Sequence, residues 1–337
     1  QYPPFIIAEM SGNHNQSLER AFQLVDAAAN SGAHAVKLQT YTADTITLDV
    51  RGGAFDIADK DSLWSGKNLH DLYQEAHTPW AWHQPIMERA KGHGMLCFSS
   101  PFDETAVDFL NDLGVPAFKV ASFENSHLPL IRHIAKTGKP IIMSRGMATI
   151  AELDEAVTTA RDAGCKDLIL LKCTSTYPAT PQNTNLVTIP HLMDLFGIQV
   201  GLSDHTMGVG TSVAAVALGA TVIEKHFTLQ RSDGGVDSAF SLEPEELEAL
   251  VIETERAWDS MGSVRYGPTE AEEKSLAYRR SLYVSEDITA GEKFTDKNLR
   301  VVRPGLGLHP RHYETLLGRS IAVDAKKGDP VSWDMFG

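Results

Sequence analysis

The sequence predicts a (β/α)₈ barrel followed by a small second domain, and three features of the chain lead to this prediction. Eight short apolar runs alternate with stretches of helical periodicity before residue 262. Nearly every run ends in polar residues, as expected where barrel strands reach the functional face. The alternation stops after Met261, and the remaining residues are polar, rich in Gly and Pro and short of helix.

The apolar runs have the length and composition of buried parallel strands. The predicted strands are Phe5–Met10, Ala35–Thr40, Met95–Ser100, Ala117–Ser122, Pro140–Arg145, Leu168–Cys173, Gln199–Asp204 and Val222–Phe227. Strands that alternate with helices form βαβ units and a parallel sheet. Eight such units suffice to close a barrel, although an open, doubly wound sheet shows the same alternation and stays the alternative.

Helical patterns fill most of the intervals between these strands. The predicted helices are Ser17–Asn30, Trp80–His93, Glu104–Leu113, Leu128–Lys136, Ile150–Ala163, Val209–Leu218 and Pro244–Met261. Ser17 is a good cap for the first helix, and Ser31 with Gly32 ends it. The segment Tyr41–Lys67 is rich in Thr, Asp and Gly. It is too long for an ordinary strand-to-helix connection, so we interpret it as an excursion above the barrel, where functional loops collect.

The break in pattern sets the predicted domain boundaries. Residues 1–262 form the barrel, residues 263–280 a polar linker and residues 281–337 the second domain, with short strands at Ser281–Ser285 and Ser320–Val323. A domain of this size buries little core of its own. We therefore expect the second domain to pack against the barrel or against a second subunit.

Composition excludes several classes of protein. The net charge of −14 without basic runs argues against nucleic acids and anionic membrane surfaces as partners. No stretch of about 18 apolar residues predicts a membrane span. The three cysteines Cys97, Cys165 and Cys173 are too few for a disulfide framework and fit a reducing, cytoplasmic location. We interpret Cys97 and Cys173 as small core residues.

Polar residues at the strand ends would converge on one cavity if the barrel closes. They are Glu9, Ser11, Asn13, His14, Lys37, Gln39, Ser99, Ser100, Lys119, Ser122, Glu124, Ser144, Lys172, Thr174, Ser175, Tyr177, Ser203, Asp204, His205, Glu224, Lys225 and His226. Lys37 and Lys119 suit a phosphate or carboxylate, and serine hydroxyls add neutral hydrogen bonds. Any one of these residues could simply fill a barrel layer. So many unpaired polar groups together would destabilise a core, which favours a ligand site.

His205 and His226 are the candidate metal ligands, because they lie at the ends of adjacent predicted strands. Two imidazoles completed by water and a substrate oxygen suit Mn²⁺ or another octahedral divalent ion better than structural zinc. The chain has 13 histidines, and a single histidine is more often a core or surface residue than a ligand.

At these residues the chain resembles the sialic acid synthase family along its whole length. The barrel motifs that carry the resemblance are Ile7-Ala8-Glu9, Lys37-Leu38-Gln39-Thr40, Ser99-Ser100-Pro101-Phe102, Lys119-Val120-Ala121-Ser122, Gly201-Leu202-Ser203-Asp204-His205 and Glu224-Lys225-His226-Phe227. The tail, with Arg303-Pro304 and Lys327-Gly328-Asp329, resembles the antifreeze-like SAF domain.

Within the family the chain is most similar to the members that make pseudaminic acid. The pointers are Gln39-Thr40-Tyr41-Thr42, Thr78-Pro79-Trp80-Ala81-Trp82-His83, Ser122-Phe123-Glu124, Leu171-Lys172-Cys173-Thr174-Ser175-Thr176-Tyr177-Pro178 and Gly307-Leu308-His309-Pro310. Arg145 departs from the pattern, since most members have Thr there.

The resemblance implies an enzyme that condenses phosphoenolpyruvate with the open-chain aldehyde of an acetamido sugar. The implied sugar is 2,4-diacetamido-2,4,6-trideoxy-altrose, and the products are pseudaminic acid and phosphate. The implied phosphoenolpyruvate ligands are Lys37, Ser100, Lys119, Ser122, Ser144, Ser175 and Ser203. The implied contacts to sugar or water are Glu9, Glu124, Tyr177, Asp237 and Arg303.

Other roles follow from the same resemblance. His205 and His226 are expected to hold Mn²⁺, Mg²⁺ or Co²⁺, and Glu9 to position or deprotonate the attacking water. The SAF domain is expected to cover the partner's site in a domain-swapped homodimer, where Arg303 reaches the sugar.

Two alternative functions stay open. The chain could be a legionaminic or N-acetylneuraminic acid synthase, with the same barrel chemistry and different sugar contacts. It could also be a non-catalytic carbohydrate- or ice-binding protein, because fold alone does not settle function. The combination of Glu9, Lys37, Lys119, His205 and His226 argues against the second alternative.

Overall fold

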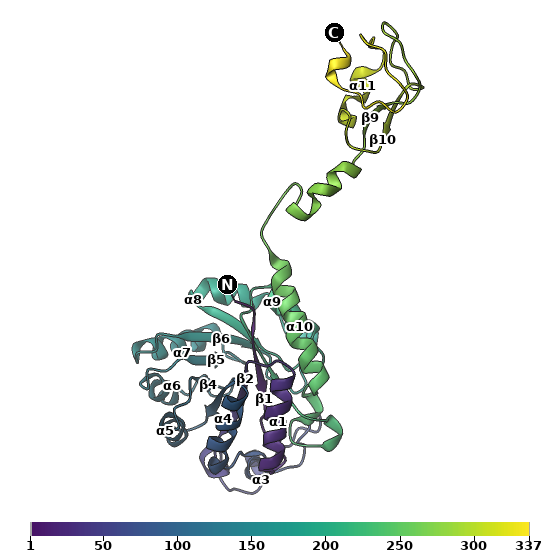
Figure 1. The fold of residues 1–337 in the computed structure, drawn as a ribbon. Coiled ribbons are helices and arrows are strands. Elements are labelled where there is room, and N and C mark those ends of the chain that lie inside the picture. Colours follow the sequence, from purple (N-terminus) through teal and green to yellow (C-terminus); the bar gives the residue numbers. More distant parts are fainter. Residues whose placement is uncertain (1, 337) are drawn as a thin grey trace. The chain divides into compact units, whose positions relative to one another are not determined.

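The computed structural model describes residues 2–336, which form two compact units that divide between Gly262 and Ser263 (Figure 1). The first unit is a barrel with surrounding helices, and the second contains a small antiparallel sheet. Within residues 2–336, no helix combines the length and the apolar character needed to span a membrane.

The first unit is a closed barrel of parallel strands in which each strand pairs with the next and β8 pairs with β1. The strands are β1 Phe5–Glu9, β2 Ala35–Thr40, β3 Leu96–Pro101, β4 Phe118–Val120, β5 Ile141–Ser144, β6 Leu168–Cys173, β7 Gln199–Ser203 and β8 Val222–His226. The predicted barrel is therefore confirmed. The open-sheet alternative is wrong, because an open sheet would leave two unpaired edges.

Helices surround the barrel, and most of them begin at the predicted places (Figure 1). They are α1 Leu18–Asn30, α4 His83–Gly92, α5 Glu104–Asp112, α6 Leu128–Ala135, α7 Ile150–Asp162, α8 Thr188–Phe196, α9 Gly210–Ala217 and α10 Pro244–Met261. The side chain of Ser17 accepts a hydrogen bond from the Arg20 amide at 3.2 Å, which satisfies one free donor of α1. Helix α8 was not predicted, because Val187 precedes it without a side-chain cap.

The excursion above the barrel is longer than predicted. It contains α2 Ala43–Ile46, the 3₁₀ turn η1 Gly53–Phe55 and α3 Leu69–Ala76, and α3 lies beyond the expected end at Lys67. Helix α2 packs against α3. A further 3₁₀ turn, η2 Trp80–Trp82, leads directly into α4, so the predicted helix at Trp80–His93 begins as a 3₁₀ turn.

The interior of the barrel is built in two layers. The lower layer is a cluster of buried apolar side chains from six strands, namely Ile7, Ala35, Phe98, Ile142, Leu171 and Val222. Inward-facing side chains recur every second residue along a strand. Two residues further along the same strands stand Glu9, Lys37, Ser100, Ser144, Cys173 and Glu224. The apolar layer is thus the floor on which these polar side chains stand.

The second unit contains few regular elements. They are η6 Glu270–Tyr278, β9 Ser281–Val284, β10 Leu299–Val302, η7 Pro310–His312, α11 Tyr313–Leu316 and η8 Trp333–Met335. Strands β9 and β10 pair antiparallel over a core that includes Leu282, Phe294 and Ile321. The predicted strand at Ser320–Val323 is wrong. Ser320 makes only an isolated bridge to Lys293, and no ladder extends from it.

Candidate active site

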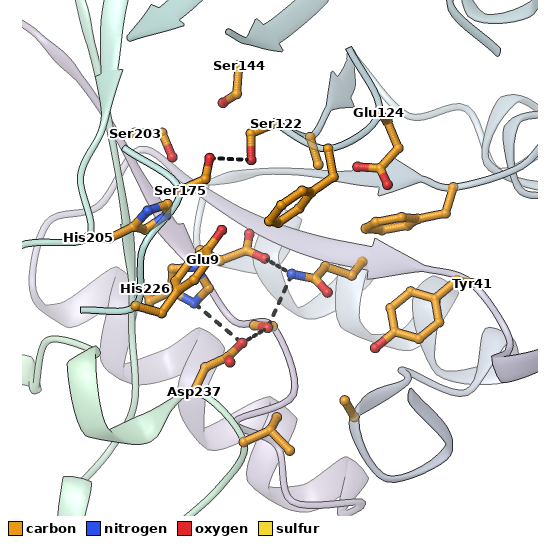
Figure 2. Close-up of a pocket in the computed structure, with 18 of the residues that line it drawn as sticks. Glu9, Tyr41, Ser122, Glu124, Ser144, Ser175, Ser203, His205, His226 and Asp237 are labelled. Carbon is orange, nitrogen blue, oxygen red and sulfur yellow. Dashed lines mark hydrogen bonds and ion pairs between the residues drawn. The ribbon is translucent and has the colours of Figure 1, made fainter. Parts of the chain in front are cut away.

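A cavity of about 530 Å³ lies at the carboxyl ends of the barrel strands (Figure 2). Nearly all of the predicted site residues line it. These are Glu9, Lys37, Lys119, Ser122, Glu124, Ser144, Ser175, Tyr177, Ser203, His205, His226 and Asp237. The alternation of inward and outward side chains places them there, since they follow the apolar floor residues or stand in the loops directly above them.

One predicted residue of the first unit does not line the cavity. Ser100 is buried behind Lys37, whose Nζ donates to Ser100 Oγ at 3.3 Å. Arg303 belongs to the second unit, where it is exposed, and its role stays a prediction. Cys173 was expected to be a core residue, but its thiol lines the cavity.

Four buried charged side chains form the base of the cavity. Lys37 Nζ lies 2.6 Å from Glu9 Oε2 and 3.9 Å from Glu224 Oε2, and Lys119 Nζ lies 3.2 Å from Glu224 Oε1. Ser203 Oγ donates to Glu224 Oε1 at 3.0 Å. Each of these side chains is largely shielded from solvent, so its charge is stabilised mainly by its neighbours. We call Glu9, Lys37, Lys119 and Glu224 the charged cluster.

The protonation of the charged cluster favours an anionic ligand. Burial raises the pKa of Glu9 to about 7, against the attraction of Lys37. Burial opposes the charge of Glu224 as well, but Lys119 and Lys37 together hold its pKa below the usual value. Near neutral pH, Glu9 is therefore partly protonated while Glu224 is ionised. Burial lowers the pKa of Lys119, whereas for Lys37 the effect of burial is outweighed by Glu224 and Glu9, which raise its pKa. Lys37 therefore supplies the firmer positive charge for a phosphate or carboxylate.

The sequence identifies Glu224 as a polar residue at a strand end, but the predicted site residues do not include it. The signal was present, because Glu224 stands two residues before His226 and so shares its face of β8. Gln39 and Ser11 were missed in the same way. Gln39 Nε2 donates to Glu9 Oε1 at 2.8 Å and to Ser11 Oγ at 3.2 Å, which orients the Glu9 carboxylate.

Serine hydroxyls form a second side of the cavity beside Lys119. Ser175 Oγ donates to Ser122 Oγ at 2.9 Å (Figure 2). Ser144 Oγ is buried and has no hydrogen-bond partner within residues 2–336. Burying a hydroxyl without a partner is costly. A ligand that supplies an acceptor to Ser144 would remove this cost, as a phosphate or carboxylate oxygen can.

The two predicted metal ligands face one another, with 5.4 Å between the ring centroids of His205 and His226. His205 Nδ1 donates to the Thr174 carbonyl at 2.9 Å, so Nε2 is the ring nitrogen left for a metal ion. Burial opposes the charged form of His205, but the Cys173 thiol outweighs burial and raises the pKa of the ring. His226 Nδ1 is buried, has no hydrogen-bond partner in the part of the chain that the structure describes, and lies 3.6 Å from Asp237 Oδ2. Burial also holds the pKa of His226 well below its usual value, so the ring is neutral.

These two imidazoles fit a divalent metal ion. Residues 2–336 contain no group of three or more His, Cys, Asp or Glu side chains arranged to hold one. The donor set on the protein is therefore the histidine pair, and the remaining positions would fall to water and substrate oxygens.

Glu124, Tyr177 and Asp237 surround the upper cavity. The Tyr177 ring lies 4.4 Å from the His205 ring, and Ser11 Oγ donates to an Asp237 carboxylate oxygen. Burial raises the pKa of Glu124 to about 7, and its Oε2 has no hydrogen-bond partner among the described residues. The arrangement joins two lysines, several hydroxyls, two imidazoles and four carboxyl groups in one cavity.

Comparisons with known proteins show the family to which the chain belongs. Residues 24–266 match the NeuB family, and residues 279–337 match the SAF domain. The chain is 45% identical to a pseudaminic acid synthase of Campylobacter jejuni, over 98% of this chain and 96% of that protein. It is 41% identical to a pseudaminic acid synthase of Helicobacter pylori, over 98% of this chain and 97% of that protein.

A solved structure shows the same likeness in three dimensions. The crystal structure of N-acetylneuraminic acid synthetase from Leptospira borgpetersenii in complex with citrate aligns with a TM-score of 0.72 at 32% identity. The alignment covers 82% of this chain and 90% of that chain. The chain belongs to the NeuB family and carries a C-terminal SAF domain.

Proposed function

We propose that the protein condenses phosphoenolpyruvate with the open-chain form of 2,4-diacetamido-2,4,6-trideoxy-altrose to give pseudaminic acid and phosphate. The observation that carries this proposal is the buried pair Lys37 and Lys119, which lines one cavity together with the imidazoles of His205 and His226. The similarity to pseudaminic acid synthases supports the choice of sugar.

Phosphoenolpyruvate binds at the charged cluster in this proposal. Lys37 and Lys119 contact its phosphate and carboxylate, with hydrogen bonds from the hydroxyls of Ser122, Ser144, Ser175 and Ser203. Ser100 acts through Lys37, since its Oγ accepts from the ammonium group. The unpartnered Ser144 hydroxyl supports this placement.

The reaction forms a carbon–carbon bond and a carbon–oxygen bond, breaks a second carbon–oxygen bond, and converts the aldehyde oxygen to a hydroxyl by adding a proton. The C3 carbon of phosphoenolpyruvate attacks the aldehyde carbon, and water adds to C2. The C2–O bond to phosphate then breaks, and inorganic phosphate leaves. Glu9 accepts the proton of the attacking water, because its carboxylate lies beside Lys37 and its pKa near 7 suits proton transfer at neutral pH.

His205 and His226 would hold a divalent metal ion, Mn²⁺, Mg²⁺ or Co²⁺. When bound, the ion supplies a Lewis acid for the aldehyde oxygen. Glu124, Tyr177 and Asp237 contact the sugar, since they line the cavity above the charged cluster.

We also propose a cytoplasmic homodimer in which the second unit of one protomer covers the cavity of its partner. Arg303 then binds the acetamido carbonyl of the sugar with its fixed set of donors. The exposure of Arg303 and of residues 262–280 is consistent with this role.

Phosphate release tests the proposed function directly. The protein is assayed with phosphoenolpyruvate, a divalent metal ion and each of a panel of acetamido sugars. The products are identified by mass spectrometry. Phosphate release is expected with 2,4-diacetamido-2,4,6-trideoxy-altrose. A clear preference for the legionaminic or N-acetylneuraminic acid precursor would overturn the sugar assignment, and no release with any sugar would overturn the enzyme assignment.

A further inference from the structure

Helix α3 directs its apolar face into the cavity. Leu69, Leu72, Tyr73 and Ala76 stand at positions i, i+3, i+4 and i+7 of this helix, which places them on one face. All four line the cavity, together with Ile46 and Ile57 of the same excursion. We call these six residues the apolar wall.

The apolar wall lies outside the hydrophobic core clusters, although Leu72 itself is buried. None of its six members belongs to the buried apolar clusters that residues 2–336 form. The other face of α3 is polar and exposed, and Glu75 pairs there with Lys67 at 2.5 Å. The helix is thus amphipathic with its apolar face toward an open cavity. Such a surface is stabilised when an apolar group covers it.

The remaining lining determines which part of a ligand reaches this wall. Lysines, hydroxyls and imidazoles line the strand ends, while Tyr41, the first residue of the excursion, lies across the cavity from His205 and Ser203 (Figure 2). Under the proposed function, the aldehyde carbon must lie beside phosphoenolpyruvate at the strand ends. The opposite end of the sugar chain then lies against the apolar wall.

We propose that the apolar wall is the specificity element of the enzyme and that it takes the C6 methyl group of a 6-deoxy sugar. Only Tyr73 among its six side chains carries a hydrogen-bonding group. A hydroxyl at C6 would lose water on binding and find few partners, whereas a methyl group gains from burial. The inference rests on the proposed function and adds the part of the substrate that the excursion selects.

A matched pair of sugars tests this inference. The 6-deoxy sugar is 2,4-diacetamido-2,4,6-trideoxy-altrose, and its counterpart differs only by a hydroxyl at C6. We expect kcat/KM for the 6-deoxy sugar to be about 10–100-fold higher, the range in which apolar pockets discriminate such groups. Equal kcat/KM for the two sugars would overturn the inference while leaving the synthase assignment intact. No phosphate release with either sugar, or with any other acetamido sugar, would instead remove the proposed function and this inference with it.

Variants locate the preference on the wall. Ile57→Thr and Leu72→Asn should bring the ratio of the two kcat/KM values toward one, with the KM for phosphoenolpyruvate unchanged. Leu48→Asn is the matched control, because Leu48 is 62% exposed in the same excursion and does not line the cavity. Ile57 is only half-buried, so its variant stays informative if Leu72→Asn unfolds. A wild-type ratio retained by folded Ile57→Thr protein would refute the assignment to this wall.

Discussion

Replacing Lys119 with glutamine should weaken phosphoenolpyruvate binding without unfolding the barrel, because Glu224 keeps Lys37 and Ser203 as partners. The substitution keeps a long polar side chain and removes the charge that lies 3.2 Å from Glu224. A hydrogen bond to a charged group contributes about 1.5–3 kcal/mol. Since about 1.4 kcal/mol corresponds to a factor of ten, the KM for phosphoenolpyruvate should rise about 10–150-fold.

Lys225 offers a matched control for this substitution. It is buried like Lys119 and follows Glu224 in β8, but it faces away from the cavity and its Nζ lies 3.0 Å from Asp204 Oδ2. Breaking a buried ion pair costs up to about 3–5 kcal/mol. Lys225→Gln should therefore lower the Tm and leave the KM for phosphoenolpyruvate unchanged.

Steady-state phosphate release at varied phosphoenolpyruvate, with a thermal melt of each variant, separates the two effects. A wild-type KM in Lys119→Gln would show that Lys119 does not bind phosphoenolpyruvate. An equal rise in KM in folded Lys225→Gln protein would also contradict the prediction, because the effect of Lys119→Gln could then come from lost stability.

Three further predictions concern the metal, the base and the dimer. EDTA should abolish phosphate release, and added Mn²⁺, Co²⁺ or Mg²⁺ should restore it. The metal should not restore activity in His205→Ala or His226→Ala, and full activity of the wild type in metal-free buffer would contradict the prediction. Burial raises the pKa of Glu9 to about 7, so kcat/KM should rise as the pH passes about 7 and Glu9 loses its proton. The pKa of Glu124 is also raised to about 7, but Glu9→Gln should remove this rising limb and Glu124→Gln should keep it. Refolding His226→Ala together with Arg303→Ala should restore partial activity if the cap is swapped, and heterodimers without activity would reject the swap.

The raised pKa of Glu9 also affects stability. The folded state holds the Glu9 proton more tightly than the unfolded state, whose pKa is near 4.5. This contribution to the free energy of unfolding is present below that value and is lost as the pH rises toward about 7. Between these values, Glu9→Gln should therefore lose less stability with rising pH than the wild type.

The sequence was sufficient to predict the barrel and most of its cavity, because both depend on local periodicity. In β1, apolar Ile7 and polar Glu9 are two residues apart and so share the inward face of the strand. The change from apolar to polar marks the end of the strand that lines the cavity. The role of Glu224 was harder to predict, because its carboxylate lies near both Lys37 and Lys119, which belong to two other strands. That contact arises only when the barrel closes.

The excursion was harder to predict for a different reason. The apolar face of α3 follows helical periodicity, but the sequence does not tell whether such a face meets a core or a cavity. Helix α8 lacks a side-chain cap and so lacked the usual start signal. In the second unit, β10 pairs with β9 across a long connection, and short strands of this kind depend on tertiary contacts.

The two-layer interior limits how this enzyme can evolve. Glu9, Lys37 and Glu224 each stand two positions beyond an apolar floor residue, so the insertion or deletion of one residue within such a strand would exchange the inner and outer faces beyond that point. The excursion that carries the apolar wall has no such constraint, because it lies outside the barrel register. Mutation can therefore reshape the excursion to accept a different sugar, while the reacting groups at the strand ends are inherited together.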